Sequence, residues 1–133
     1  MAITLDTLHR EWKQKSFRPL YVFAGDEAFF MDRAMEVLSQ ETLEEHERDF
    51  NLTVLYGRDT DAGMVMSEAK RFPMMAERTV VLVKEAQNLK DLEALSAYVE
   101  HPQPSTILAL ALNGKKLDKR KALYKALQKH EGV

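Results

Sequence analysis

Cysteine is absent from this chain of 133 residues, so neither a disulfide framework nor a thiolate metal site can form. Its absence is typical of a protein in a reducing, cytoplasmic setting. No apolar run approaches the ~20 residues that span a bilayer, and the first ten residues lack the basic-then-apolar order of a signal peptide. Because 45% of the residues are hydrophobic, which is enough to fill one core, we expect a single cytoplasmic domain with no membrane contact.

A strong net charge is also lacking, since −2 is too close to zero to indicate a partner. The charges are nevertheless unevenly distributed. From Asn113 onward the net charge is +5, so the 112 preceding residues carry −7. Tyr124 is the only aromatic residue in this basic tail. Because nucleic-acid grooves usually place aromatic residues among the basic ones, the tail fits a solvated helix face better. The charged residues of the tail are Lys115, Lys116, Lys119, Arg120, Lys121, Lys125 and Lys129, against Asp118 and Glu131.

Four short apolar runs predict buried strands, at residues 20–24, 52–56, 79–83 and 106–112. They are rich in branched and aromatic residues, and two of them have no polar alternation, which is typical of strands covered on both faces. A segment of helical period follows each run. The pattern therefore predicts an α/β fold, a parallel sheet with helices on both faces.

Each predicted helix has an apolar stripe whose members are three or four residues apart. One helix precedes the sheet and begins at Thr4, and we expect later helices to begin at Asp26, Asp91 and Asp118. The stripes are Leu5, Leu8 and Trp12; Phe30, Ala34, Val37 and Leu38; Ala62, Val65, Ala69 and Phe72; Leu92, Leu95 and Tyr98 or Val99; and Ala122, Leu123, Ala126 and Leu127.

No internal repeat or flexible linker divides the sequence. Residues 131–133 come where a fifth strand would be expected to begin after the last helix. We therefore expect residues 1–133 to be one domain of a longer protein, with further domains after Val133.

The loops at the carboxyl ends of the strands are where an open parallel sheet binds ligands. A nucleotide-binding domain has a phosphate loop of the form GxxxxGK[ST] there, whereas this chain has Gly25, Asp26 and Glu27 and no lysine. A carboxylate ~4 Å from a phosphate charge repels it by ~4 kcal/mol at an effective dielectric of ~20. ATP binding is therefore not expected, and we interpret Asp26 as a helix cap and Glu27 as a first-turn acid.

Other catalytic sites have little support in the sequence. No nucleophile motif such as GxSxG is present. An acidic Mg²⁺ pocket could be assembled from Asp26, Glu27 and Lys115, but strand 79–83 runs into residues 84–85 without the aspartate that such a switch phosphorylates. We therefore expect no catalytic residue, no metal and no cofactor. The histidines lie in separate predicted elements without metal-ligand spacing: His9, His46, His101 and His130.

Residues 70–78 carry the strongest functional signal. Pro73 cannot continue the hydrogen bonding of a preceding helix and disfavours the α conformation at Phe72, so the chain should break there. Met74 and Met75 would then occupy a turn and point in different directions, which leaves at least one of them at the surface. Methionine is flexible and polarizable, which suits insertion into an apolar pocket of a partner. The other interpretation, that both methionines cap the edge of the sheet core, stays open.

Three stretches of the sequence resemble the N-terminal domain of the delta subunit of bacterial DNA polymerase III, a clamp-loader family. They are LYVFAGDE at residues 20–27, RFPMMAERTVVLV at 71–83 and LDKRKALYKAL at 117–127. The order and spacing of the three carry the resemblance, which covers nearly the whole chain.

The resemblance implies an AAA+-type, P-loop-like fold with a degenerate nucleotide site. It also implies a subunit of the polymerase III holoenzyme that binds and opens the DNA sliding clamp without catalytic residues of its own. The implied partners are the beta clamp, the gamma/tau and delta prime subunits of the loader, and DNA through the assembled complex. An enzyme or switch that uses a nucleotide or Mg²⁺ in the loops at the carboxyl ends of the strands is the alternative.

In members of this family the clamp contact is made by an apolar pair, commonly leucine and phenylalanine, on a short helix before the third strand. Met74 and Met75 match these positions, so the resemblance implies that they enter the clamp's pocket. Pro73 and Arg78 belong to the same implied contact. Phe72 is expected to add to its rim, although its place in a helix stripe makes it the better candidate for the core.

Overall fold

Four parallel strands form the central sheet of the computed structural model, which describes residues 4–114 and 118–129. All three neighbouring pairs of strands are parallel. The apolar runs of the sequence predicted each strand of this sheet to within one residue at either end. In their order across the sheet, the strands are β1 (Leu20–Gly25), β4 (Thr106–Asn113), β3 (Thr79–Lys84) and β2 (Leu52–Tyr56).

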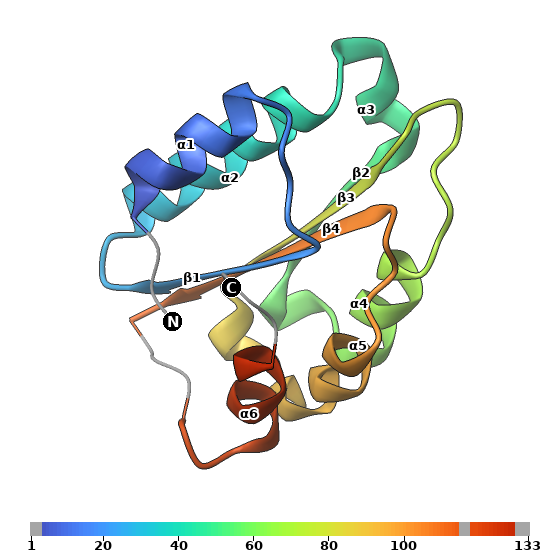
Figure 1. Ribbon diagram of the computed structural model, residues 1–133. Helices are drawn as coiled ribbons and strands as arrows, with labels where there is room; N and C mark the ends of the chain where they lie inside the picture. The colour runs from blue at the N-terminus through green and yellow to red at the C-terminus, as the bar shows by residue number, and fades with distance from the viewer. Residues whose placement is uncertain (1–3, 115–117, 130–133) are drawn as a thin grey trace.

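Helices cover both faces of the sheet, as the alternation of strands and helical segments predicted (Figure 1). On the first face lie α1 (Leu5–Lys13), α2 (Ala28–Thr42) and α3 (Glu45–Asn51). On the second face lie α4 (Ala62–Ala69), α5 (Ser96–Glu100) and α6 (Ala122–Gln128). Three short 3-10 helices complete the described chain: η1 (Gly57–Asp59), η2 (Ala86–Asn88) and η3 (Leu92–Leu95).

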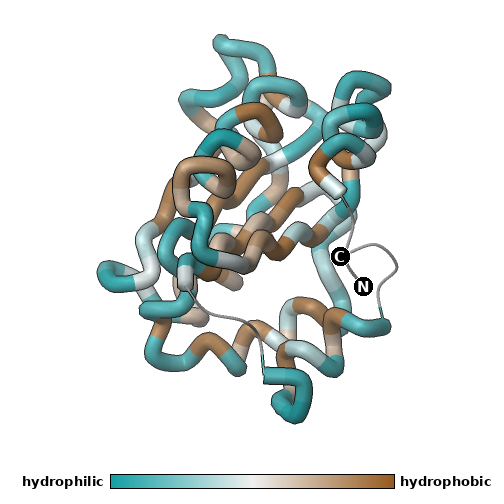
Figure 2. The backbone as a smooth tube through the Cα atoms, turned by 90° about the vertical axis from the view of Figure 1, so that its left-hand side faces the viewer, coloured by the Kyte–Doolittle hydropathy of each residue, from teal (hydrophilic) through white to brown (hydrophobic). Residues whose placement is uncertain are grey.

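The inner strand β4 separates two hydrophobic layers, because successive side chains of a strand point to opposite faces. Leu108, Leu110 and Leu112 pack in the layer of α4, α5 and α6. Ile107 and Ala109 pack in the layer of α1 and α2. The first seven of the eight residues of β4 are buried, and Figure 2 shows the hydrophobic colour concentrated along the strands in the middle of the molecule.

Thr4 begins the first helix as predicted. Its hydroxyl oxygen accepts a hydrogen bond from the backbone N–H of Thr7 at 3.2 Å, which satisfies one of the free donors of the first turn. Leu8 and Trp12 of the predicted stripe are buried. Among the described residues, no helix combines the length and apolar character that crossing a membrane requires.

Two of the predicted helix starts were wrong. Glu27, not Asp26, occupies the N-cap position of α2, and no side chain caps this helix. Asp118 was expected to begin the last helix, but α6 begins four residues later. The carboxylate of Asp118 accepts a hydrogen bond from the backbone N–H of Arg120 at 2.9 Å, a local turn that competes with helix formation.

Some apolar side chains that the stripes assigned to the core lie at the surface. Phe30 is 54% exposed, because the buried face of α2 is formed by Met31, Ala34, Met35 and Leu38 instead. Ala122 is exposed as well. The sequence analysis also missed α3, whose residues EHERDFN contain one large apolar side chain and therefore no stripe.

A buried hydrogen-bond network ties α1 to β1. Trp12 is fully buried, and its Nε1–H donates to the hydroxyl oxygen of Tyr21 at 3.0 Å. The backbone N–H of Arg18 donates to the same oxygen at 2.8 Å. Burial raises the pKa of the Tyr21 hydroxyl above its ordinary value.

Replacing Tyr21 with Phe should therefore destabilise the fold. The substitution removes the oxygen that accepts the hydrogen bonds from Trp12 and Arg18, which costs about 1–3 kcal/mol of unfolding free energy. Urea unfolding followed by tryptophan fluorescence measures this loss. Tyr124→Phe removes a hydroxyl from the surface helix α6 and is the matched control, expected to unfold at the native midpoint. Equal midpoints for Tyr21→Phe and the native chain would contradict the prediction.

Candidate functional site

The longest connection beside the sheet is the segment between α4 and β3, here called the 71–78 loop (Figure 1). The resemblance implied a short helix here, and this expectation was wrong, because residues 71–78 form only bends and irregular backbone. Pro73 has no N–H to donate to a helix and disfavours the α conformation before it. Met75 has a φ of 56°, which also prevents a right-handed helix.

The apolar side chains of the 71–78 loop face solvent. Met75 is 98% exposed, Phe72 75% and Met74 53%. Both methionines thus lie at the surface, where the sequence required at least one. The expectation that Phe72 belongs to the core was wrong, since α4 ends at Ala69 and its stripe stops there.

The backbone of Met75 is in the left-handed region, which a residue with a Cβ adopts at a cost of about 1–2 kcal/mol. Such a conformation persists only where its surroundings hold it. The neighbouring Met74 is held by Asn51, the last residue of α3, through hydrogen bonds to both its N–H and its carbonyl oxygen. The sequence analysis gave no role to Asn51, because its partner is 23 residues away along the chain.

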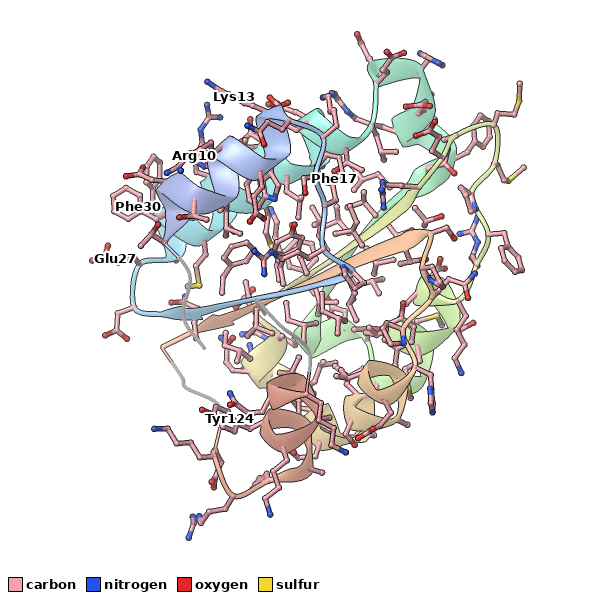
Figure 3. All side chains as sticks on the ribbon, viewed as in Figure 1. Arg10, Lys13, Phe17, Glu27, Phe30 and Tyr124 are labelled. Carbon is pink, nitrogen blue, oxygen red and sulfur yellow. The ribbon has the colours of Figure 1, made fainter. Side chains whose placement is uncertain are left out.

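The carboxyl end of the 71–78 loop is also anchored. The guanidinium of Arg78 lies over the ring of Phe17, 5.4 Å from its centroid, a cation–π contact of roughly 0.5–1 kcal/mol. Phe17 lies on the segment between α1 and β1 (Figure 3). The next residue, Thr79, donates its N–H to the carbonyl oxygen of Ser105 at 2.9 Å. Of the five predicted contact residues, Arg78 and Pro73 are therefore half-buried, while Phe72 and the two methionines project.

At the opposite end of the sheet, the turn after β1 contains the acidic pair of the sequence analysis. Gly25 has a φ of 147°, a conformation that residues with side chains rarely adopt, and it leads directly into Asp26 and Glu27. The backbone N–H of Gly114 donates to the carbonyl oxygen of Gly25 and closes this end of β1 against β4. Lys115, the third residue of the hypothetical Mg²⁺ pocket, lies outside the described residues.

An open pocket of about 200 Å³ lies beside this turn, between α2 and the carboxyl ends of β2, β3 and β4. Its charged lining residues are Asp32, Lys84 and Glu85, and Lys84 approaches the Asp32 carboxylate at 3.9 Å. Two carboxylates against one ammonium group disfavour a phosphate. In the part of the chain that the structure describes, no group of three or more acidic or histidine side chains could hold a metal ion.

Comparison with known proteins identifies the family. The model of the family "DNA polymerase III, delta subunit" matches residues 21–133. The chain belongs to this family. DNA polymerase III subunit delta of Bacillus subtilis is 30% identical over 128 residues, which cover 89% of this chain and 37% of that protein. The chain therefore spans little more than a third of the length of this relative.

A comparison with solved structures also finds a delta protein. The Bacillus subtilis DNA clamp loader delta protein has a TM-score of 0.86 and 29% sequence identity, covering 96% of this chain and 40% of that one. A DNA polymerase III gamma subunit-related protein of Thermotoga maritima has a TM-score of 0.64 at 13% identity, over 96% of this chain and 43% of that chain. RuvB of the same organism, at 18% identity and a TM-score of 0.56, covers 95% of this chain and 40% of its own. The last two show the fold alone, and the delta-family chain thus has an AAA+-like fold.

The acidic turn and pocket of this delta-family chain predict that ATP with Mg²⁺ does not change its melting temperature. A ligand present at 100 times its dissociation constant stabilises a protein by ~2.7 kcal/mol, which a thermal shift measurement detects readily. A nucleotide-binding AAA+ ATPase serves as the positive control. A clear upward shift with ATP and Mg²⁺ would favour the nucleotide-dependent switch instead.

Proposed function

We propose that this chain is a non-catalytic module that binds the bacterial sliding clamp through the 71–78 loop and stabilises its open form. The observation that carries this proposal is the exposure of Phe72, Met74 and Met75 on a loop whose backbone is fixed by contacts to the core. Exposed apolar side chains that cluster on one loop are typical of a protein contact. Met74 and Met75 are proposed as the inserted pair.

Burial of the two methionines alone does not supply the free energy of a micromolar contact, so residues around them must also contribute. Fully burying one methionine side chain supplies roughly 1.5–3 kcal/mol, so two supply roughly 3–6 kcal/mol. A micromolar dissociation constant corresponds to about 8 kcal/mol. Phe72 is 75% exposed and can be buried beside the methionines, while Pro73 and Arg78 shape the base of the loop.

Clamp opening by this chain needs no chemistry of its own. A binder shifts a ring from closed to open only by its different affinities for the two forms. The acidic turn at residues 25–27 and the pocket beside it do not suit a phosphate. We therefore assign control of when the clamp is opened to ATP-binding subunits of the loader. We propose the gamma/tau and delta prime subunits of the loader as partners of this chain, and the cytoplasm as its location.

Residues 1–133 are proposed to be the N-terminal AAA+-like domain of a delta subunit. The relatives that the chain matches are much longer, at 37–40% coverage of their length. Oligomerisation with the other loader subunits, and contact with DNA, are assigned to the assembled complex. Within this chain the basic residues of α6 and the turn before it, residues 119–129, are the part with the charge to approach DNA.

Titration of the chain against a bacterial beta clamp tests the contact. Met74→Ala combined with Met75→Ala should weaken binding at least 100-fold, because roughly 3 kcal/mol or more of apolar burial is lost. The melting temperature should stay close to the native value, since the two side chains are mostly exposed.

Met64→Ala is the matched control for this titration. Met64 is 52% exposed on α4, outside the 71–78 loop, so its removal should leave clamp binding unchanged. Full-strength binding by the double alanine variant would refute the assignment of the contact. A double variant that fails to fold would favour the interpretation that the methionines complete the core.

A further inference from the structure

Asn51 makes the most unusual polar contact among the described residues of the 71–78 loop. It is the last residue of α3 and is 1% exposed. Its side-chain carbonyl oxygen accepts a hydrogen bond from the N–H of Met74 at 2.7 Å, and its Nδ2 donates to the carbonyl oxygen of Met74 at 2.8 Å. Nδ2 also donates to the carbonyl oxygen of Glu47 at 2.9 Å. One buried side chain thus holds both backbone groups of Met74.

The side chain of asparagine fits this position for a chemical reason. The amide has two N–H donors and one acceptor oxygen, and all are used here, toward Glu47 and Met74. Aspartate at position 51 would offer no donor to the two carbonyl oxygens, and leucine would offer neither donor nor acceptor. A buried amide that pairs with both groups of one residue mimics the pairing of a neighbouring strand.

The topology of the sheet brings the two residues together. β2 and β3 are parallel neighbours, and Leu52 is paired with Val80. The amino ends of β2 and β3 therefore lie side by side at the same end of the sheet. Asn51 directly precedes β2, and the 71–78 loop directly precedes β3. Figure 1 shows the loop passing α3 on its way into β3.

The two hydrogen bonds between Asn51 and Met74 also explain how Met75 keeps its left-handed backbone conformation. Met75 has a φ of 56° and is 98% exposed, so its own side chain makes no packing contact that could hold the backbone there. The nearest restraint is the pair of hydrogen bonds on the preceding residue. Strained backbone that persists at an exposed position is typical of a site where geometry serves recognition.

We propose that Asn51 is a positioning residue for the clamp contact. It fixes the backbone of Met74, and through it the left-handed turn at Met75, so that both side chains are presented outward before a partner arrives. Asn51 itself is buried and would not touch the partner. This inference rests on the proposed function of the 71–78 loop.

The test uses Asn51→Ala, with Asn51→Ser as a milder variant in case the first does not fold. Amide hydrogen exchange followed by NMR measures how well Asn51 protects the Met74 N–H, and it needs no partner protein. Exchange at the Met74 amide should accelerate at least tenfold, because its acceptor is gone, while the amides of β3 and β4 exchange at the native rate. An unchanged rate at Met74, or an equal acceleration at all amides, would overturn the inference.

Clamp titration of the same variants measures the consequence. Asn51→Ala should weaken binding about tenfold or more, although no contacting side chain is altered. In a Met75→Ala background, the further loss caused by Asn51→Ala should be at least threefold smaller, because the two residues act on the same contact. Additive losses would show that Asn51 acts by general destabilisation and would overturn its positioning role.

Gln87→Ala provides the matched control. Gln87 lies in η2, and its side-chain oxygen accepts from the backbone N–H of Asn113 at 2.9 Å, a similar contact at the other end of the sheet. Its loss should leave clamp binding unchanged. If Met74→Ala with Met75→Ala abolishes binding but Asn51→Ala does not weaken it, the positioning role fails and the proposed function stands. If the native chain does not bind the clamp, both fail.

Discussion

The burial of the two inner strands, β3 and β4, on both faces of the sheet is the constraint on which the other features of this molecule depend. In β3 and β4, the inner strands, all but the last residue is buried, so every crossing connection must pass over a face and pack there. The two candidate sites of this chain lie in loops at the two ends of the strands. The amino end of β3 carries the apolar 71–78 loop, and the carboxyl ends of the strands carry the acidic turn and the charged pocket. The two ends thus differ in charge: the acidic turn and the charged pocket lie at the carboxyl ends, where Phe29 and Phe30 are also exposed, whereas the 71–78 loop presents its apolar side chains at the amino end of β3.

The same constraint decides how much of the fold could be predicted from the sequence. A strand buried on both faces is a continuous apolar run, and β4, with the sequence TILALALN, is recognised by this alone. Helix positions depend instead on local competition. Asp118 forms a turn with Arg120 rather than a cap, and Phe72 leaves the stripe of α4 because the helix ends at Ala69. α3 has no apolar stripe, so the periodicity of its sequence did not indicate a helix, and the Glu44–Glu47 capping box was overlooked.

The candidate site was predictable in its residues but not in its geometry. Pro73 indicated where the chain breaks, and two adjacent methionines after it indicated an exposed apolar pair. The left-handed turn at Met75 was not predictable, since methionine has no preference for that region. Asn51 was missed because its two hydrogen bonds to Met74 join segments that only the parallel pairing of β2 and β3 brings together. Such contacts are properties of the tertiary fold and leave no local pattern.

The proposed contact combines a fixed backbone with adaptable side chains, and each half has a physical reason. A loop that must order itself on binding loses affinity to the entropy of ordering, whereas a loop already held at Met74 and Arg78 loses less. A ring is opened only by a binder that distinguishes its open form from its closed form, and a loop free to follow either surface would bind both equally. Methionine side chains can still adjust to the walls of an apolar pocket. The buried amide of Asn51 would thus fix the orientation in which the loop meets its partner, and the two methionine side chains would adapt to the shape of the pocket.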